Sequence, residues 1–284
     1  MVDSLKITIE AAKKRGDIPD HILLEGPAGA GKTTLVNILV EETGAELVEQ
    51  IGGLVSSKDD VYLLIDYIRS KPNLVVFIDE IHRAKKKYIE VLYSVMQDFH
   101  FNGEPLNRFT LIGATTTRGM LMKPFADRFK HTYALSFYTD EEIAQIIKFI
   151  VPQMKKDIAM EIATRSQGIP RIAKNLLIEV MNTAYARHNR KIPIKKDVTE
   201  TFIRLDVDKL GLTNVDRGIL KYLHQHKKAS ERTLMSVFEL AKDDLNFLHE
   251  TYLLRHGLIE KTGRGRVITD TGIKHLDKGK VKEK

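Results

Sequence analysis

The chain has 284 residues, contains no cysteine and carries a formal net charge of +7. This length can bury a full hydrophobic core and favours two or three modules over one. Without cysteine, disulfides and thiolate metal sites are excluded, and the ten histidines show no HExxH-like pairing, so we predict no structural metal. No apolar run approaches the roughly 18 residues of a membrane span, so we expect a soluble, cytoplasmic protein with no membrane partner.

Strand-like apolar runs alternate with helical patterns through the first half of the chain. The runs cover residues 21–24, 45–49, 74–78, 109–114 and 131–135. Alternation of this kind indicates an α/β fold, with a mostly parallel sheet covered by helices on both faces. We predict that residues 1–136 form this domain and that a nucleotide binds at the carboxyl ends of its strands.

A glycine-rich segment separates the first apolar run from the helical pattern that follows it. Its sequence is Gly26-Pro27-Ala28-Gly29-Ala30-Gly31-Lys32-Thr33. The order of strand, turn and helix is that of a P-loop, which presents backbone N–H groups and a helix N-terminus to phosphates. We predict that residues 26–33, with Thr34, bind ATP, that Lys32 neutralises the β- and γ-phosphates, and that the Thr33 hydroxyl binds Mg2+.

Two adjacent carboxylates, Asp79 and Glu80, end the third apolar run. Strands often run into charged loops, but this pair follows Lys32 by 47 residues with a strand between them, which is typical of a nucleotide site. We predict that Asp79 holds Mg2+ alongside Thr33. Glu80 is then available to orient and deprotonate the attacking water.

The fourth apolar run ends in threonines that begin at Thr115. A hydroxyl at the end of the strand beside the acidic one can touch the γ-phosphate or the attacking water. We predict this role for Thr115 over ordinary capping of the strand end, which threonine also performs well. His82 and Arg83 directly follow the acidic pair, and we assign them no catalytic role because the entry to a helix commonly faces solvent.

Two arginines are singled out by their position rather than by a local pattern. Arg128 could supply a finger to the ATP of a neighbouring subunit, because the loose phosphoryl transition state rewards a guanidinium that arrives in trans. The alternative is a surface arginine paired with Asp127 or with another group nearby. Arg171 follows the turn at Gly168 and could reach the γ-phosphate, and the alternative is a solvated first-turn arginine, which the helix dipole mildly disfavours. Spacing alone leaves these alternatives open.

The β pattern stops after Phe137. A capping box at 139–142 and a helix from about Pro170 to His188 predict a small all-helical domain at residues 137–206. Three short helical patterns followed by a glycine-containing hairpin then predict a winged-helix domain at residues 207–276. The lysine-rich residues 277–284 are predicted to form a basic, disordered tail.

The C-terminal part of the chain is the more basic part. Residues 207–284 hold 16 Lys and Arg against 11 Asp and Glu, which suggests a polyanionic partner. Arg264 and Arg266 flank Gly265 at the predicted tip of the hairpin. We predict that both bind DNA, where they would straddle the phosphate backbone or enter a minor groove. Wings also serve as protein contacts, and that alternative stays open.

Taken together, these motifs resemble the RuvB family, the AAA+ motors that drive branch migration of Holliday junctions. The resemblance is collinear from about residue 9 to residue 269. The most specific segments are Asp79-Glu80-Ile81-His82-Arg83 and Leu111-Ile112-Gly113-Ala114-Thr115-Thr116. Further similarity lies in residues 21–27, 127–129, 168–173 and 262–266.

The resemblance implies an AAA+ P-loop domain, a helical lid domain and a C-terminal winged helix, assembled as a homo-oligomeric, hexameric ring with ATP at the subunit boundaries. It implies that Thr115 is sensor 1, that Arg128 is the finger acting in trans and that Arg171 is sensor 2. It also assigns Arg264 and Arg266 to contact with duplex DNA. In the family, the ring pulls duplex DNA through the junction.

One departure from the family concerns its partner protein. Between residues 99 and 109 the family carries a longer β-hairpin that docks on the junction-binding protein RuvA, whereas only residues 100–108 stand here. This weakens the expectation of a RuvA-type partner. It slightly favours the runner-up hypothesis, an AAA+ clamp- or helicase-loader switch that hydrolyses ATP once per event.

Two further classes are disfavoured by the residues present. A regulatory DNA-binding protein that only senses nucleotide has no need of the water-activating Glu80. A P-loop kinase would want an acceptor site and an arginine-rich lid, and the sequence suggests neither. Our leading hypothesis is therefore an ATP-hydrolysing DNA motor of RuvB type that acts in recombination or repair.

Overall fold

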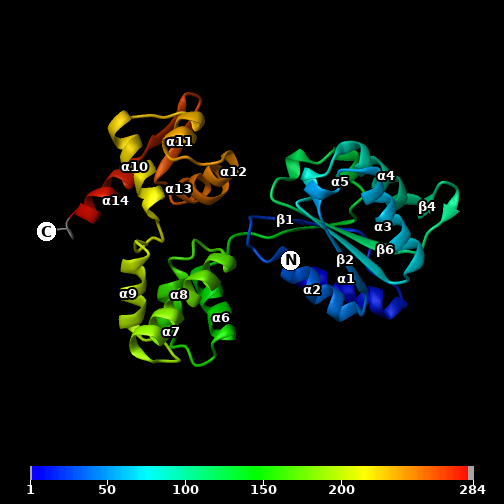
Figure 1. Ribbon diagram of the computed structural model, residues 1–284, viewed down its shortest axis with the longest axis horizontal. Coiled ribbons are helices and arrows are strands. Elements are labelled where there is room, and N and C mark those ends of the chain that lie inside the picture. The colour runs from blue at the N-terminus through cyan, green and yellow to red at the C-terminus, as the bar shows by residue number, and fades with distance from the viewer. Residues whose placement is uncertain (1, 281–284) are drawn as a thin grey trace. The chain divides into compact units, whose positions relative to one another are not determined.

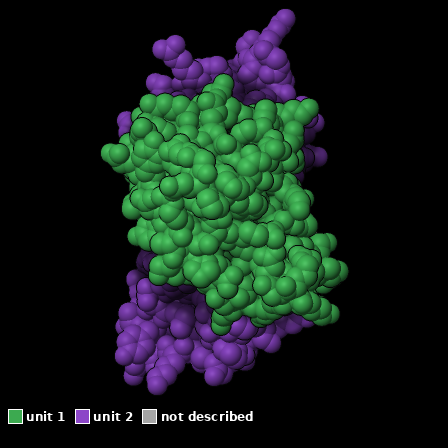
Figure 2. Space-filling model, turned by 90° about the vertical axis from the view of Figure 1, so that its right-hand side faces the viewer, with its two compact units in different colours: residues 1–136 green, residues 137–284 purple. Residues whose placement is uncertain are grey.

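The computed structural model describes residues 2–280. The chain divides into two compact units, residues 1–136 and residues 137–284, which are coloured separately in Figure 2. Over the described part of the chain, no helix combines the length and the apolar character that crossing a membrane requires.

The first unit is built on a five-stranded parallel sheet (Figure 1). The strands run in the order β2-β3-β6-β1-β7, and their bounds are β1 (Ile22–Glu25), β2 (Glu46–Ile51), β3 (Leu74–Asp79), β6 (Phe109–Thr115) and β7 (His131–Ala134). Every pair of neighbouring strands is parallel. The five predicted strands are therefore confirmed to within one or two residues at each end. The parallel arrangement brings the carboxyl ends of β1, β3 and β6 to one edge of the sheet.

Helices cover both faces of this sheet, as expected for strands that are apolar on both sides. The helical elements are α1 (Val2–Arg15), α2 (Lys32–Thr43), η1 (Gly52–Leu54), α3 (Lys58–Ser70), η2 (Ile81–Arg83), α4 (Lys86–Asp98), η3 (Arg118–Met120) and α5 (Lys123–Ala126). Helices α1 and α2 pack with Val75 and Phe77 on one face. Helices α3 and α4 pack with Val76 and Ile78 on the other. Alternate residues of β3 thus enter two separate cores.

A small hairpin links α4 to β6. It consists of β4 (His100–Phe101) and β5 (Glu104–Pro105), paired antiparallel. Asn102 and Gly103 form its turn, and both have positive φ angles, 51° and 81°, as a tight two-residue turn requires. The short segment recognised in the sequence is therefore a hairpin of two residues per strand.

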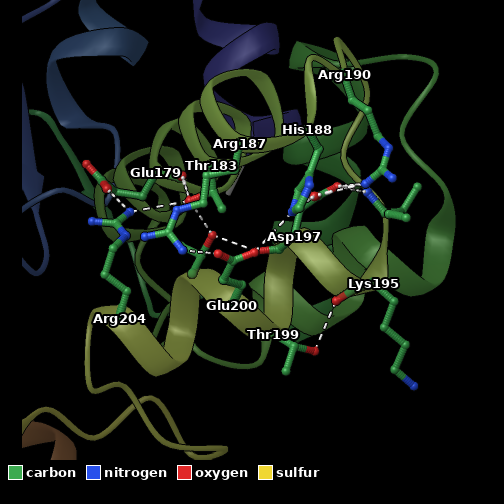
Figure 3. Close-up of polar contacts among 12 residues, drawn as sticks. Glu179, Thr183, Arg187, His188, Arg190, Lys195, Asp197, Thr199, Glu200 and Arg204 are labelled. Carbon is green, nitrogen blue, oxygen red and sulfur yellow. Dashed lines mark hydrogen bonds and ion pairs between the residues drawn. The ribbon is translucent and has the colours of Figure 1, made fainter.

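The second unit begins with four helices, α6 (Asp140–Ile150), α7 (Lys156–Ala163), α8 (Pro170–His188) and α9 (Lys195–Arg204). Thr139 caps α6 in the predicted capping box. These helices share one apolar core. Figure 3 shows the polar contacts that fasten α9 to α8 and the turn after it, where the fully buried Asp197 accepts from Arg190 at 3.2 Å and Glu200 meets His188 at 3.1 Å. Paired in this way, the buried carboxylate is compensated.

The rest of the second unit has the winged-helix arrangement. Its elements are α10 (Asn214–His226), α11 (Glu231–Val237), α12 (Lys242–Asp244), the π-helical turn η4 (Leu245–Glu250), α13 (Thr251–Arg255), β8 (Ile259–Thr262), β9 (Gly265–Ile268) and α14 (Asp270–Lys280). Strands β8 and β9 form the predicted hairpin, and a bridge from Ala229 to Arg266 extends it. The predicted tail is wrong for residues 277–280, because they continue α14. Residues 281–284 lie outside the described residues.

Arg255 joins the winged helix to the helical part of the second unit. Its guanidinium donates to the carbonyl of Gln167 at 2.5 Å and lies 3.9 Å from the centroid of the Phe137 ring. Gln167 in turn donates from Nε2 to the carbonyl of Gly211 at 3.0 Å. These contacts attach the end of α13 to Gln167 and Phe137, and the segment before α10 to Gln167.

Candidate nucleotide site and DNA-binding elements

The P-loop between β1 and α2 has the backbone that its sequence predicts. Three of its glycines have positive φ angles: Gly26 147°, Gly29 78° and Gly31 97°. At Gly26 a side chain is also excluded by space, because an added Cβ would lie 2.5 Å from the carbonyl oxygen of Leu135. Helix α2 starts at Lys32 without a side-chain cap and without an acidic residue in its first turn. This helix terminus therefore suits an anion.

The Lys32 side chain lies folded along the loop. It is only 6% exposed, and its ammonium donates to the carbonyls of Gly26 at 2.8 Å and Pro27 at 3.1 Å. The ammonium group is therefore held against the backbone of the loop that is predicted to bind the phosphates.

A cavity of about 410 Å³ opens beside the P-loop. Both Thr33 and Asp79 line it, together with Glu49, Gln50, Ile51, Leu54 and Phe77. The parallel sheet accounts for this meeting, since α2 and the end of β3 reach the same edge. A threonine hydroxyl and a carboxylate are the hard oxygen donors that Mg2+ prefers, so the two residues fit the predicted ion.

Glu80 stands at a sharp turn directly after β3. Its φ of 48° and ψ of 46° are left-handed, an uncommon conformation for a residue with a side chain. The neighbouring Gly52 makes room for this turn, because a Cβ at position 52 would lie 2.2 Å from the Glu80 carbonyl oxygen. The amide of Glu80 donates to the Asp79 carboxylate at 2.9 Å. Asp79 thus lines the cavity beside the P-loop, whereas Glu80 contacts Thr116.

The threonines after β6 contact two different groups. The hydroxyl of Thr116 donates to the Glu80 carboxylate at 3.1 Å. The hydroxyl of Thr115 is fully buried, meets Nδ1 of His82 at 2.9 Å and accepts from the amide of Thr117 at 3.0 Å. Thr116 is therefore the threonine in direct contact with the predicted catalytic carboxylate, whereas Thr115 reaches it through His82.

His82 belongs to this site, which the sequence interpretation missed. Its side chain is 7% exposed, so it does not face solvent, and Nδ1 lies 3.2 Å from the Glu80 carboxylate. Its other ring nitrogen, Nε2, lies 3.4 Å from the Thr117 hydroxyl. The contacts of His82 with Thr115 and Thr117 join residues more than 30 positions apart, so no local pattern in the sequence could reveal them.

Arg128 lies in the loop after α5 and does not pair with Asp127. It donates from Nη2 to the hydroxyl of Tyr93 at 2.6 Å, and its guanidinium carbon lies 4.6 Å from the centroid of the same ring. The Nε group of Arg128 is buried without a hydrogen-bond partner among the described residues. The structure thus replaces the expected pair with Asp127 by a contact with Tyr93 in the same subunit.

Arg171 is exposed at the second residue of α8. Pro170 occupies the first position of the helix, where the missing N–H costs nothing. Gly168 has a φ of 71°, and a Cβ there would lie 2.6 Å from the carbonyl oxygen of Tyr138. This close approach fixes the start of α8, from which Arg171 projects.

The two wing arginines have different environments. Arg264 is exposed in the turn between β8 and β9. Arg266 is only 5% exposed, because it turns inward and pairs with Glu250 at 2.7 Å and with Glu231 at 3.5 Å. The prediction that Arg266 extends from the tip to meet DNA is wrong. The signal that could have revealed this is Glu250, an acidic residue on the apolar face of a helix that needs a buried partner.

Three family models match the chain in succession. Residues 1–135 match the Holliday junction DNA helicase RuvB P-loop domain, residues 138–208 the RuvB AAA lid domain, and residues 209–277 the RuvB C-terminal winged helix domain. The chain belongs to the RuvB family. This confirms the resemblance noted in the sequence and the order of P-loop, lid and winged-helix domains.

Individual relatives support the same family. The chain is 36% identical to the Holliday junction branch migration complex subunit RuvB of Ehrlichia chaffeensis, with 97% of this chain and 88% of that one covered. It is 37% identical to the subunit of that name in Bdellovibrio bacteriovorus, with 94% and 86% covered. The solved structure of the Thermotoga maritima RuvB Holliday junction branch migration motor matches with a TM-score of 0.89 and 35% identity, covering 97% of this chain and 93% of that one.

Proposed function

We propose that this protein is an ATP-hydrolysing AAA+ motor that moves DNA to drive branch migration of Holliday junctions in recombination and repair. The observation that carries the proposal is the position of Glu80. Glu80 follows β3 at the same edge of the parallel sheet at which the P-loop follows β1, in a chain that continues into a RuvB lid and a RuvB winged helix. A nucleotide sensor has no use for such a carboxylate.

Each residue around the P-loop has its own role in ATP hydrolysis. Residues 26–34 bind the phosphates of ATP, with the N-terminus of α2 and Lys32 opposing their charge. Thr33 and Asp79 would hold Mg2+, which when bound supplies charge neutralisation at the β- and γ-phosphates. Glu80 orients the attacking water and accepts its proton. Thr115 and Thr116, with His82, position Glu80.

Completion of the site requires a second copy of the chain. The loose phosphoryl transition state rewards a guanidinium that arrives from outside the nucleotide's own subunit, and Arg128 is the candidate. We therefore propose a homo-oligomer, in the form of a hexameric ring, with ATP at each subunit boundary. Arg171 on α8 would contact the γ-phosphate from the lid.

Duplex DNA or a four-way junction is the proposed substrate of the winged helix. Arg264, exposed at the tip of the β8–β9 hairpin, supplies one phosphate contact. A junction-binding partner of RuvA type stays a weaker proposal, because the β4–β5 hairpin has only two residues in each strand. The loader alternative is not favoured by the comparisons, since the relatives are named as branch migration subunits.

Measurement of ATP turnover tests the proposal. Turnover should rise when duplex or four-way DNA is added, and Glu80→Gln should abolish hydrolysis while nucleotide still binds. Electron microscopy with DNA and a slowly hydrolysed ATP analogue should show rings with DNA threaded through them. A lack of DNA stimulation together with full turnover in Glu80→Gln would reject the motor.

A further inference from the structure

Tyr93 on α4 contacts Arg128, the residue proposed above to act on the nucleotide of the neighbouring subunit. Tyr93 accepts a hydrogen bond of 2.6 Å from Nη2 of Arg128, and the guanidinium carbon lies 4.6 Å from the centre of the same ring. One side chain therefore engages the guanidinium twice, once through the hydroxyl and once through the ring face.

The rest of the loop is fixed by burial. Phe125 and Phe129, on either side of Arg128, are 1% and 5% exposed, and their rings meet edge to face at 5.2 Å. The amide of Arg128 donates to the carbonyl of Phe125 at 3.1 Å. The backbone of the loop is therefore anchored in the core of the first unit. The Arg128 side chain is still long and flexible, and the contact with Tyr93 restricts its rotamers.

The buried Nε of Arg128 points to a role beyond packing. This group has no hydrogen-bond partner among the described residues, which is a cost that a purely structural arginine would avoid. Arginine also loses much rotamer freedom when it is held in place. A guanidinium ordered in advance does not have to lose that freedom during the reaction, which is the basis of preorganised electrostatic catalysis.

We propose that Tyr93 is a positioning residue that orders the Arg128 guanidinium for action in trans on the nucleotide of the next subunit. The proposal rests on the proposed function, because it takes Arg128 as the finger. In this role Tyr93 acts through Arg128.

The first test compares Tyr93→Phe with Tyr88→Phe. Tyr88 lies on the same helix and also has a cation over its ring, that of Lys87 at 4.7 Å, so it is a matched control. Loss of one hydrogen bond predicts a kcat lower by about 3- to 10-fold in Tyr93→Phe, with unchanged KM for ATP. Tyr88→Phe should match the unchanged protein. In an Arg128→Ala background, Tyr93→Phe should cause no further loss.

The second test separates action in trans from an effect within one subunit. Tyr93→Phe protein and unchanged protein are each mixed with an excess of Glu80→Gln protein, which hydrolyses no ATP but carries an intact Tyr93 and Arg128. Turnover is then expressed per hydrolysing subunit. The turnover per hydrolysing subunit should then be the same in the two mixtures. The reason is that the Arg128 acting on each hydrolysing subunit now belongs to a Glu80→Gln neighbour with an intact Tyr93.

A difference that stays at 3- to 10-fold in the mixtures would overturn the proposal, as would a further loss in the double variant or a raised KM. Should Tyr93→Phe lower the melting temperature, the mixtures still decide, because a folding defect of that subunit is not repaired by its neighbours. The proposed function fails separately, by full turnover in Arg128→Ala.

Discussion

The Thr116 hydroxyl donates to the Glu80 carboxylate at 3.1 Å, whereas Thr115, one residue earlier, points its hydroxyl into the buried contact with His82. Thr115 is the last residue of β6 and Thr116 follows it in a bend, so the two hydroxyls contact different groups. Replacement of Thr116 and replacement of Thr115 should therefore have different effects on turnover and on stability.

Thr116→Val should lower kcat roughly tenfold without a change in thermal stability, because it removes a hydrogen bond to a charged group at the surface of the site. Thr115→Val should also destabilise the fold, by about 1–3 kcal/mol, since it leaves the amide of Thr117 and His82 without their shared partner. Steady-state ATPase and melting curves measure the two effects. Equal loss of stability in both variants would contradict this assignment.

Gly52 should be essential for the turn at Glu80. A Cβ at position 52 would lie 2.2 Å from the Glu80 carbonyl oxygen, so Gly52→Ala must displace one of the two backbones. We expect a lower kcat and a loss of about 1–3 kcal/mol in stability. Gly53→Ala is the control, because nothing lies within 4 Å of its added Cβ. Normal turnover in Gly52→Ala would show that the turn does not set the position of the carboxylate.

Replacement of the two wing arginines should affect different properties, stability for Arg266 and DNA binding for Arg264. Arg266→Ala leaves the buried Glu250 with Lys261 as its remaining ion-pair partner and should cost about 3 kcal/mol, which thermal or denaturant unfolding would detect. Arg264→Ala should leave stability unchanged, weaken DNA binding and reduce the slope of log affinity against log salt by about 1. The assignment would be wrong if the melting temperature fell for Arg264→Ala rather than for Arg266→Ala.

Stability should depend on pH through His21. Burial lowers the pKa of His21 below its usual 6.5, and its Nδ1 accepts from the amide of Leu111 while Nε2 meets the carbonyl of Met96. Below pH 6.5 the unfolded chain binds a proton that the folded chain resists, so stability is complete above that pH and falls as the pH drops. Melting temperatures between pH 7.5 and 5 should decline less steeply in His21→Gln. If the melting temperatures of both proteins fell equally with pH, His21 would not be the cause of the pH dependence.

The sequence predicted the elements that depend on local pattern. Apolar runs located the strands, and the glycines and Lys32 located the P-loop, because both signals lie within ten residues. The contacts of His82 with Thr115 and of Arg128 with Tyr93 join residues 33 and 35 positions apart, and only the fold brings them together. Arg266 was misjudged because a hairpin residue faces either solvent or the core, and its acidic partners lie on separate helices.

Branch migration of a synthetic four-way junction with labelled arms tests the central claim most directly. With ATP, the unchanged protein should convert the junction into two duplexes, and Glu80→Gln should bind the same junction without converting it. A protein that hydrolyses ATP on this DNA yet leaves the junction in place, or a Glu80→Gln variant that still converts it, would contradict the account.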